Sequence, residues 1–148
     1  MGTAYAHRDT GRAMSEENVQ IVSRVFDALE SPDAAVRALW HPDVEFDVSR
    51  DIWGPLVGGG RYRGVEGVRS WMLDLYSGWE KVDLSCEELI DAGEQVIAVL
   101  GVRGRGRVSG IELEYRPAGV WTLRQGKVVR VVWFPTRDEA LEAAGLAA

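Results

Sequence analysis

The sequence predicts an α+β fold in which a cone-shaped, strongly curved antiparallel sheet packs on three N-terminal helices and a short C-terminal helix follows. The first observation is in residues 96–134, where small and polar residues at Val108-Ser109-Gly110 and at Gln125-Gly126 separate three apolar runs. Such residues form tight turns between antiparallel strands. The second observation is that apolar residues in 15–40 and 64–77 recur at helical spacing. We therefore expect helices to cover a sheet built mainly from the second half of the chain.

The size and composition of the chain limit the class of protein. A chain of 148 residues fits one domain that buries roughly two thirds of its unfolded surface. Its hydrophobic content of 46% is ordinary for a soluble globular protein, and no apolar run approaches the roughly 20 residues that span a membrane. The net charge of -6 argues against nucleic-acid binding, because that binding depends on basic residues neutralising phosphates.

The N-terminal residues and the cysteine content suggest where the domain begins and where the protein resides. Residues 1–14 are polar and contain two glycines, so we expect a disordered tail before a single domain at residues 15–146. Cys86 is the only cysteine, which rules out an intrachain disulfide. The lack of a cysteine framework favours a cytoplasmic location.

Two helices are predicted at the start of the domain. Ser15 is a suitable N-cap, and the glutamates that follow favour the positive end of a helix that ends near Glu30. Ser31-Pro32 repeats the start signal, with a cap residue followed by proline at the first helical position. His41-Pro42 ends this second helix, since the residue before a proline is pushed away from helical backbone angles.

The middle of the chain alternates between regular and irregular segments. Residues 44–49 alternate in polarity, which predicts a short strand with Val44, Phe46 and Val48 facing inward. Residues 51–63 contain four glycines and a proline together with large apolar residues, so we expect an irregular segment that closes one end of a cavity.

Three further elements complete the predicted fold. Residues 64–77 return to helical spacing and give a third helix. The strand from Val82 loses its alternation at residues 88–90, where we expect a bulge. Residues 137–146 are good helix formers and close the fold.

The turn at Ser109-Gly110 sets the predicted register of the central strands. As a two-residue turn it predicts three pairs on the outer face of the sheet: Arg107 with Glu112, Arg105 with Glu114, and Arg103 with Arg116. The opposite, inner face then carries Val96, Ala98, Leu100, Val102, Leu113, Tyr115, Trp121 and Leu123. Because Ile97 and Val99 share the outer face with the arginines, we expect a second copy to cover that face in a homodimer.

Several segments of this sequence resemble one family in order and spacing. They are Leu39-Trp40-His41-Pro42-Asp43-Val44-Glu45, Tyr62-Arg63-Gly64 leading into Trp71, Arg124-Gln125-Gly126-Lys127-Val128, and Glu139-Ala140-Leu141-Glu142-Ala143-Ala144-Gly145-Leu146. From Ser15 onward the chain resembles the SnoaL-like polyketide cyclase group of the nuclear transport factor 2-like superfamily. The resemblance implies an α+β cone with an open apolar mouth, usually a homodimer, with no required metal or other cofactor.

One fold hosts many activities, so each chemistry known for this group requires its own residues in the sequence. The polyketide cyclases place an acid/base aspartate late in the sheet, whereas residues 128–135 contain no Asp or Glu. The epoxide hydrolases use an arginine and aspartate pair on one strand, but Arg103-Gly104-Arg105 offers no carboxylate. The ketosteroid isomerases need a first-helix tyrosine beside a buried aspartate, but residues 15–30 contain no Tyr and residues 100–107 no Asp. The resemblance therefore predicts the fold more firmly than the reaction.

Three ionisable residues remain candidates for catalysis. Asp51 follows the first strand and is a candidate general base, with turn capping as the alternative. His41 could move a proton near neutral pH, although a histidine at a helix end more often caps carbonyl groups. Arg130 falls opposite Trp121 if Gln125-Gly126 is the turn, where it could stack on the indole or bind a carboxylate or enolate; the alternative is an ion pair with a helix acid.

Five aromatic residues are candidates for lining a small-molecule pocket: Trp53, Tyr62, Trp71, Tyr115 and Trp121. Two hypotheses follow. The first is a cofactor-independent isomerase, cyclase or dehydratase that acts on a hydrophobic metabolite. The second is a non-catalytic protein that binds such a ligand or serves as an accessory protein.

Overall fold

The computed structural model describes residues 2–27, 37–51 and 60–146 of the chain. Its helices are α1 (Gly2–Asp27), α3 (Gly64–Ser77) and α4 (Arg137–Ala143). Its strands are β1 (Trp40–Asp47), β2 (Arg61–Arg63), β3 (Trp79–Ala92), β4 (Gln95–Gly106), β5 (Glu112–Tyr115), β6 (Ala118–Arg124) and β7 (Lys127–Phe134). The predicted helix that starts at Ser31-Pro32 lies largely outside the described residues.

The strands form one curved, open sheet in the order β2-β1-β7-β6-β4-β3, with β5 paired to β4. All neighbours are antiparallel except β1 and β7, which run parallel. The prediction of a wholly antiparallel sheet is therefore wrong at this pair. A parallel pair needs a long crossover, and here α3 and strands β3 to β6 lie between the two strands in the chain. The predicted α+β class is confirmed.

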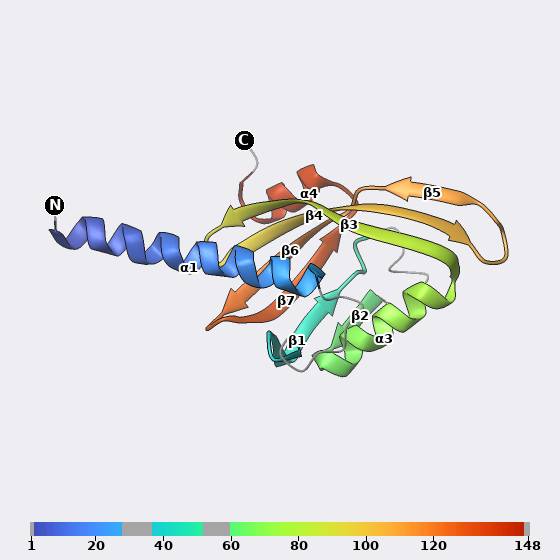
Figure 1. Ribbon diagram of the computed structural model, residues 1–148, viewed down its shortest axis with the longest axis horizontal. Helices are drawn as coiled ribbons and strands as arrows, with labels where there is room; N and C mark the ends of the chain where they lie inside the picture. Colours follow the sequence, from blue (N-terminus) through green and yellow to red (C-terminus); the bar gives the residue numbers. More distant parts are fainter. Residues whose placement is uncertain (1, 28–36, 52–59, 147–148) are drawn as a thin grey trace.

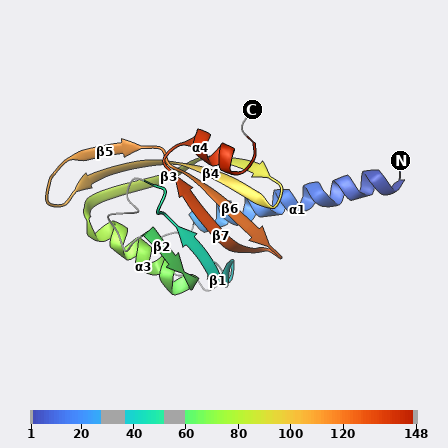
Figure 2. The same ribbon diagram turned by 180° about the vertical axis from the view of Figure 1, so that it is seen from behind.

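Helices cover the two faces of the sheet unequally. On the inner face, Ile21, Val22 and Val25 of α1 and Val68 of α3 pack with the inward side chains of the strands. On the outer face, Ala140 of α4 packs with a smaller group that includes Ile97, Val99, Val120 and Phe134. Figures 1 and 2 show α1 and α3 against one side of the sheet and α4 against the other. The inner face therefore contains the main core.

The first helix begins earlier than the sequence analysis predicts. α1 runs from Gly2 to Asp27, and its N-terminal part projects beyond the sheet in Figure 1. The sequence analysis expects a disordered tail at residues 1–14, whereas the described helix begins at Gly2. Residues 3–14 contain several alanines and arginines, which are good helix formers, while each glycine costs only about 1 kcal/mol. Extending an existing helix is also easier than nucleating a new one.

The predicted register of the β4–β5 hairpin is wrong by two residues. Arg103 pairs with Glu114 and Arg105 with Glu112, because residues 107–111 form a longer loop than a two-residue turn. In this loop Gly110 has a φ of 68°, and its N–H donates to the carbonyl of Gly106 at 3.0 Å. A shift of two residues leaves each side chain on its predicted face. Arg105 is accordingly exposed on the outer face.

The corrected register also removes the like-charge pair that the sequence predicts. Arg103 lies 3.6 Å from Glu114 and Arg116 lies 2.9 Å from Glu87, so each arginine has its own carboxylate.

The segment between the two predicted turns, expected to form one strand, is interrupted at Pro117. Proline has no N–H to donate to a neighbouring strand. β5 and β6 are therefore separate strands, and both pair with β4.

A bulge in β7 changes which residues face inward. The turn at Gln125-Gly126 is confirmed, and both residues have positive φ angles of 51° and 75°. The pairing then shifts between Leu123, which faces Val128, and Thr122, which faces Arg130. Trp121 therefore lies opposite Val131, and Arg130 lies on the outer face.

The apolar residues of the outer face are covered within the same chain. Ile97 and Val99 are 0% and 6% exposed, and they pack with Ala140 while Leu141 and Ala144 lie against the same group. The argument for a homodimer that rests on exposure of Ile97 and Val99 is therefore wrong, because α4 covers them.

Candidate ligand-binding site

Six aromatic side chains gather on the inner face of the sheet. They come from five elements that are distant in the sequence: Phe26 on α1, Trp40 and Phe46 on β1, Trp71 on α3, Trp121 on β6 and Trp133 on β7. We call these six residues the aromatic cluster. Their convergence follows from the fold, since α1 and α3 pack against the inward side chains of β1, β6 and β7.

Trp121 lies at the centre of the aromatic cluster. Its ring centroid is 5.2 Å from that of Phe26, 5.4 Å from Trp40 and 6.1 Å from Trp133. Phe46 extends the cluster, with its centroid 4.8 Å from Trp71 and 6.5 Å from Trp133. The Trp121 and Trp133 rings meet nearly edge to face at 85°, an arrangement that the ring quadrupole favours. The cluster is therefore continuous from α1 to α3.

Gly119 creates the space for the two central indoles. It lies on β6 opposite Trp133. A β-carbon at this position would lie 2.9 Å from Nε1 of Trp121 and 2.9 Å from Cε3 of Trp133. Contacts this short do not occur with real side chains, so only a glycine here leaves room for both rings where they lie.

The indole N–H groups of Trp121 and Trp133 are the most unusual feature of the cluster. Both residues are almost fully buried, at 2% and 4% exposure. Neither Nε1 atom has a hydrogen-bond partner among the described residues. A buried donor without an acceptor costs about 1–3 kcal/mol, and native proteins rarely retain one without a reason. Two such donors thus belong to neighbouring indoles, whose ring centroids lie 6.1 Å apart.

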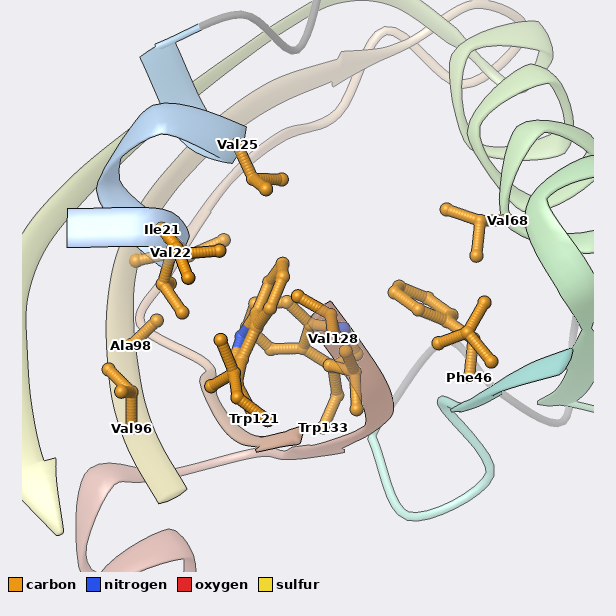
Figure 3. Packing of buried hydrophobic residues seen from close by; sticks show 14 of the residues in the cluster. Ile21, Val22, Val25, Phe46, Val68, Val96, Ala98, Trp121, Val128 and Trp133 are labelled. Atoms are coloured by element: carbon orange, nitrogen blue, oxygen red, sulfur yellow. The ribbon is translucent and has the colours of Figure 1, made fainter. Parts of the chain in front are cut away.

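Aliphatic side chains surround the cluster. Figure 3 shows Val22 and Val25 of α1 on one side of Trp121 and Trp133, and Val68 of α3 beside Phe46 on the other. The outer members of the cluster, Trp40, Phe26 and Trp71, are only partly buried, unlike the central indoles. The partly buried rings therefore border the cluster, and the two central indoles form its interior.

Asp51 is the buried charged residue of the described chain, at 8% exposure. It follows β1, and its N–H donates to the carbonyl of Val48 at 3.1 Å. The adjoining backbone is held by Gly60, whose carbonyl accepts from the N–H of Val48 at 2.7 Å. A side chain at Gly60 would lie 2.7 Å from the Cα of Ser49, and its φ of 84° also favours glycine. The backbone that precedes Asp51 is thus closely packed against Gly60.

His41 lies on β1 and not at a helix end. Its Nδ1 accepts a hydrogen bond from the N–H of Asp43 at 3.0 Å. A neutral imidazole in this geometry carries its proton on Nε2. The side chain therefore satisfies a backbone donor where the pairing of β1 with β7 is irregular. In the sequence, His41 comes directly after Trp40 of the aromatic cluster.

Arg130 lies away from the aromatic cluster. It occupies the outer face beside Glu45, its neighbour on the parallel strand β1, and the two side chains are 3.9 Å apart. Both are more than half exposed. Of the two alternatives for Arg130, stacking on Trp121 is absent because the bulge in β7 places the two residues on opposite faces, and its acidic partner lies on a strand and not on a helix.

The other predicted lining residues are placed as follows. Trp121 and Trp71 are members of the aromatic cluster, and Tyr62 and Tyr115 are partly buried against the same core. The Tyr62 hydroxyl donates to Oδ2 of Asp74 at 3.4 Å. Partial burial, with the Asp74 charge and this hydrogen bond, raises the pKa of Tyr62, so the phenol stays protonated. Trp53 lies outside the described residues.

The sequence analysis missed Trp133, the second central indole. With a regular hairpin at Gln125-Gly126, Trp133 would point outward, and only the extra residue in β7 turns it inward. The sequence shows that Val131 and Trp133 share one face of the strand. It gives no local signal for the bulge that turns this face inward. Phe46 is predicted to face inward, and the structure adds its contact with Trp40, whose ring centroid lies 6.4 Å away.

The described residues show neither a metal-binding group nor a membrane span. Within 2–27, 37–51 and 60–146, no three His, Cys, Asp or Glu side chains gather closely enough to hold a metal ion. The helices of the described chain are too short or too polar to cross a membrane.

Comparison with known proteins agrees with this architecture. The family model of the SnoaL-like domain matches residues 22–131. A solved NTF2-like protein from Burkholderia thailandensis is 30% identical, with a TM-score of 0.68, and the match covers 86% of this chain and 95% of that chain. No match is found among proteins with curated functions.

Two more distant structures contain small molecules. TerC, co-crystallised with polyporic acid, is 19% identical with a TM-score of 0.68, over 87% of this chain and 98% of that chain. A protein with a ketosteroid isomerase-like fold from Catenulispora acidiphila, in complex with trimethylamine, is 16% identical with a TM-score of 0.63, over 85% and 92% of the two chains. At these identities the similarity concerns the fold.

Proposed function

We propose that this chain, which belongs to the SnoaL-like domain family, binds an apolar small molecule on the inner face of its sheet. The observation that carries the proposal is the aromatic cluster, in which rings from five elements converge under α1 and α3. Ligand sites are typically apolar and aromatic with a few polar groups. The small molecules bound by TerC and by the Catenulispora protein support the use of this fold for binding.

Binding of fluorene, a flat aromatic hydrocarbon, tests this proposal. Trp71→Ala removes a partly buried ring at the edge of the cluster, 4.8 Å from Phe46. It should weaken fluorene binding by about 1–2 kcal/mol, since stacking and apolar contact are lost. Trp79→Ala is the matched control, because Trp79 is also partly buried but packs over Gly104 outside the cluster. Equal weakening by the two substitutions would contradict the proposal.

The burial of Asp51 supports a second candidate function, proton transfer. A carboxyl removed from solvent is suited to act as a general base, and Asp51 is the buried charged side chain of the described residues. A ketone with acidic α-hydrogens, such as 2-tetralone, is a suitable probe. Wild-type protein should accelerate exchange of these hydrogens with deuterium in D₂O, and Asp51→Asn should abolish the acceleration. Identical exchange rates for the wild-type and Asp51→Asn proteins would exclude proton transfer by Asp51. Ligand binding would then be the remaining function.

A further inference from the structure

Arg107, in the loop between β4 and β5, binds the backbone where α3 leads into β3. Its Nε donates to the carbonyl oxygen of Ser77 at 3.3 Å, and its Nη2 donates to that of Trp79 at 3.1 Å. Its backbone N–H donates to the carbonyl oxygen of Gly78 at 3.2 Å. Figure 1 shows the end of α3 and the hairpin of β4 and β5 at the same end of the molecule. One residue of the hairpin loop therefore binds three successive carbonyl groups of another segment.

The C-terminal end of α3 lacks partners of its own. The last carbonyl groups of a helix have no donor within the helix, and positive charge near them complements the helix dipole. The last turn of α3 contains no basic residue. Neither Gly78 nor Trp79 has a positive φ, so α3 does not end in the left-handed cap that commonly satisfies these carbonyl groups. Arg107 therefore supplies donors and positive charge from a distant part of the chain.

The same contact connects the hairpin to the aromatic cluster through α3. Val68 and Trp71 of α3 pack on the inner face, and the Trp71 ring centroid lies 4.8 Å from that of Phe46. Trp79 adds a second connection, since its Cε3 lies 2.5 Å from where a β-carbon at Gly104 of β4 would be. The end of α3 is thus attached to β4 and its loop, although no loop residue belongs to the aromatic cluster.

We infer that Arg107 is a positioning residue of the candidate binding site. By binding the carbonyl groups at the end of α3, it sets the position of the helix that presents Val68 and Trp71 to a ligand. This inference rests on the proposed binding function. Because coupling between two sites is reciprocal, a ligand that fixes α3 also strengthens the hydrogen bond from the Arg107 N–H to Gly78.

Hydrogen exchange tests the contact with α3. Arg107 is exposed, so Arg107→Gln removes the charge and the forked donor group without changing the core. The amide protons of residues 75–77 should exchange about threefold faster than in the wild type, as expected for the loss of one net hydrogen bond, while those of β6 keep their rates. Arg107→Lys retains the charge and a donor and should restore most of this protection.

Arg105→Gln is the matched control, because Arg105 lies two residues away and donates to Glu112 across the hairpin at 2.7 Å. This substitution should leave exchange at the end of α3 unchanged. Unaltered exchange at residues 75–77 in Arg107→Gln, or an equal change in Arg105→Gln, would overturn the inference.

Fluorene binding tests the connection to the site. Arg107→Gln should weaken binding about threefold, and Arg107→Lys should bind nearly as well as the wild type. In the wild type, fluorene should slow exchange of the Arg107 amide proton. If Arg107→Gln exchanges faster at α3 but binds fluorene with unchanged affinity, Arg107 stabilises the helix without positioning the site, and the inference fails while the proposed function stands. If the wild-type protein does not bind fluorene, the two fail together.

Discussion

Gly119 on β6 and Trp133 on β7 are cross-strand partners, and the absence of a side chain at Gly119 is what accommodates the indole opposite. We expect Gly119→Ala to lower the free energy of unfolding by about 1–3 kcal/mol, since the new methyl group overpacks the core between Trp121 and Trp133. Chemical denaturation monitored by circular dichroism measures this change.

Gly101→Ala on β4 is the matched control for this prediction. The nearest atoms to a β-carbon at Gly101 belong to the exposed side chains of Glu87 and Ser85, which can move away at little cost. This substitution should change the free energy of unfolding by less than about 1 kcal/mol. If the two substitutions prove equally destabilising, the space between the indoles is not as tight as the structure shows.

The second prediction concerns the helix that covers the outer face. Ala140 of α4 is 0% exposed and faces the sheet. Ala140→Asp would therefore bury a charge and should destabilise the protein by more than about 2 kcal/mol. Undocking of α4 should also uncover Ile97 and Val99 and promote association, which light scattering detects. Ala143→Asp, on the exposed side of the same helix, should have neither effect. A monomeric, stable Ala140→Asp protein would show that α4 is not needed as a cover.

The third prediction concerns pH and the pair that joins α4 to β3. Arg137 donates to both carboxylate oxygens of Glu88, at 2.8 and 3.4 Å. This hydrogen bonding, partly opposed by desolvation and aided by the charge of Arg137, lowers the pKa of Glu88 from its ordinary value of 4.5. Because the pKa is lower in the folded state, the pair stabilises the fold above pH 4.5, and this contribution is lost as the pH falls through the lowered pKa.

Titration of the Glu88 carboxyl carbon by NMR tests this prediction. Arg137→Gln should return the pKa of Glu88 toward 4.5, whereas Arg103→Gln, which removes the partner of Glu114, should leave it unchanged. An unaltered Glu88 titration in Arg137→Gln would mean that the pair does not persist in solution.

Much of the fold is predictable from the sequence because it depends on local patterns. The helical spacing of residues 64–77 predicts α3 with its observed limits, and the loss of alternation near Glu88 corresponds to the shift in pairing between β3 and β4. The faces of Arg105 and Trp121 follow from strand alternation, which survives a shift of two residues. These features depend on residues close together in the chain.

The features that the sequence does not predict depend on single extra residues or on distant segments. One additional residue in β7 turns Trp133 inward and Arg130 outward. The aromatic cluster therefore contains a second indole and lacks the arginine that a regular hairpin would place there. The parallel pairing of β1 with β7 joins segments far apart in the sequence, and no local pattern distinguishes it from an antiparallel pair. The inner aromatic face is therefore predictable, while its hydrogen-bonding groups are not.

The most direct test of the account is to locate a bound apolar molecule on one face of the sheet. Neighbouring residues on a strand report on opposite faces, so the methyl signals of Val96 and Val131 report on the inner face and those of Ile97 and Val132 on the outer face. Titration of ¹³C-methyl-labelled protein with fluorene should shift the Val96 and Val131 signals and leave those of Ile97 and Val132 in place. Shifts of Ile97 and Val132 without changes at Val96 and Val131 would contradict binding at the aromatic cluster.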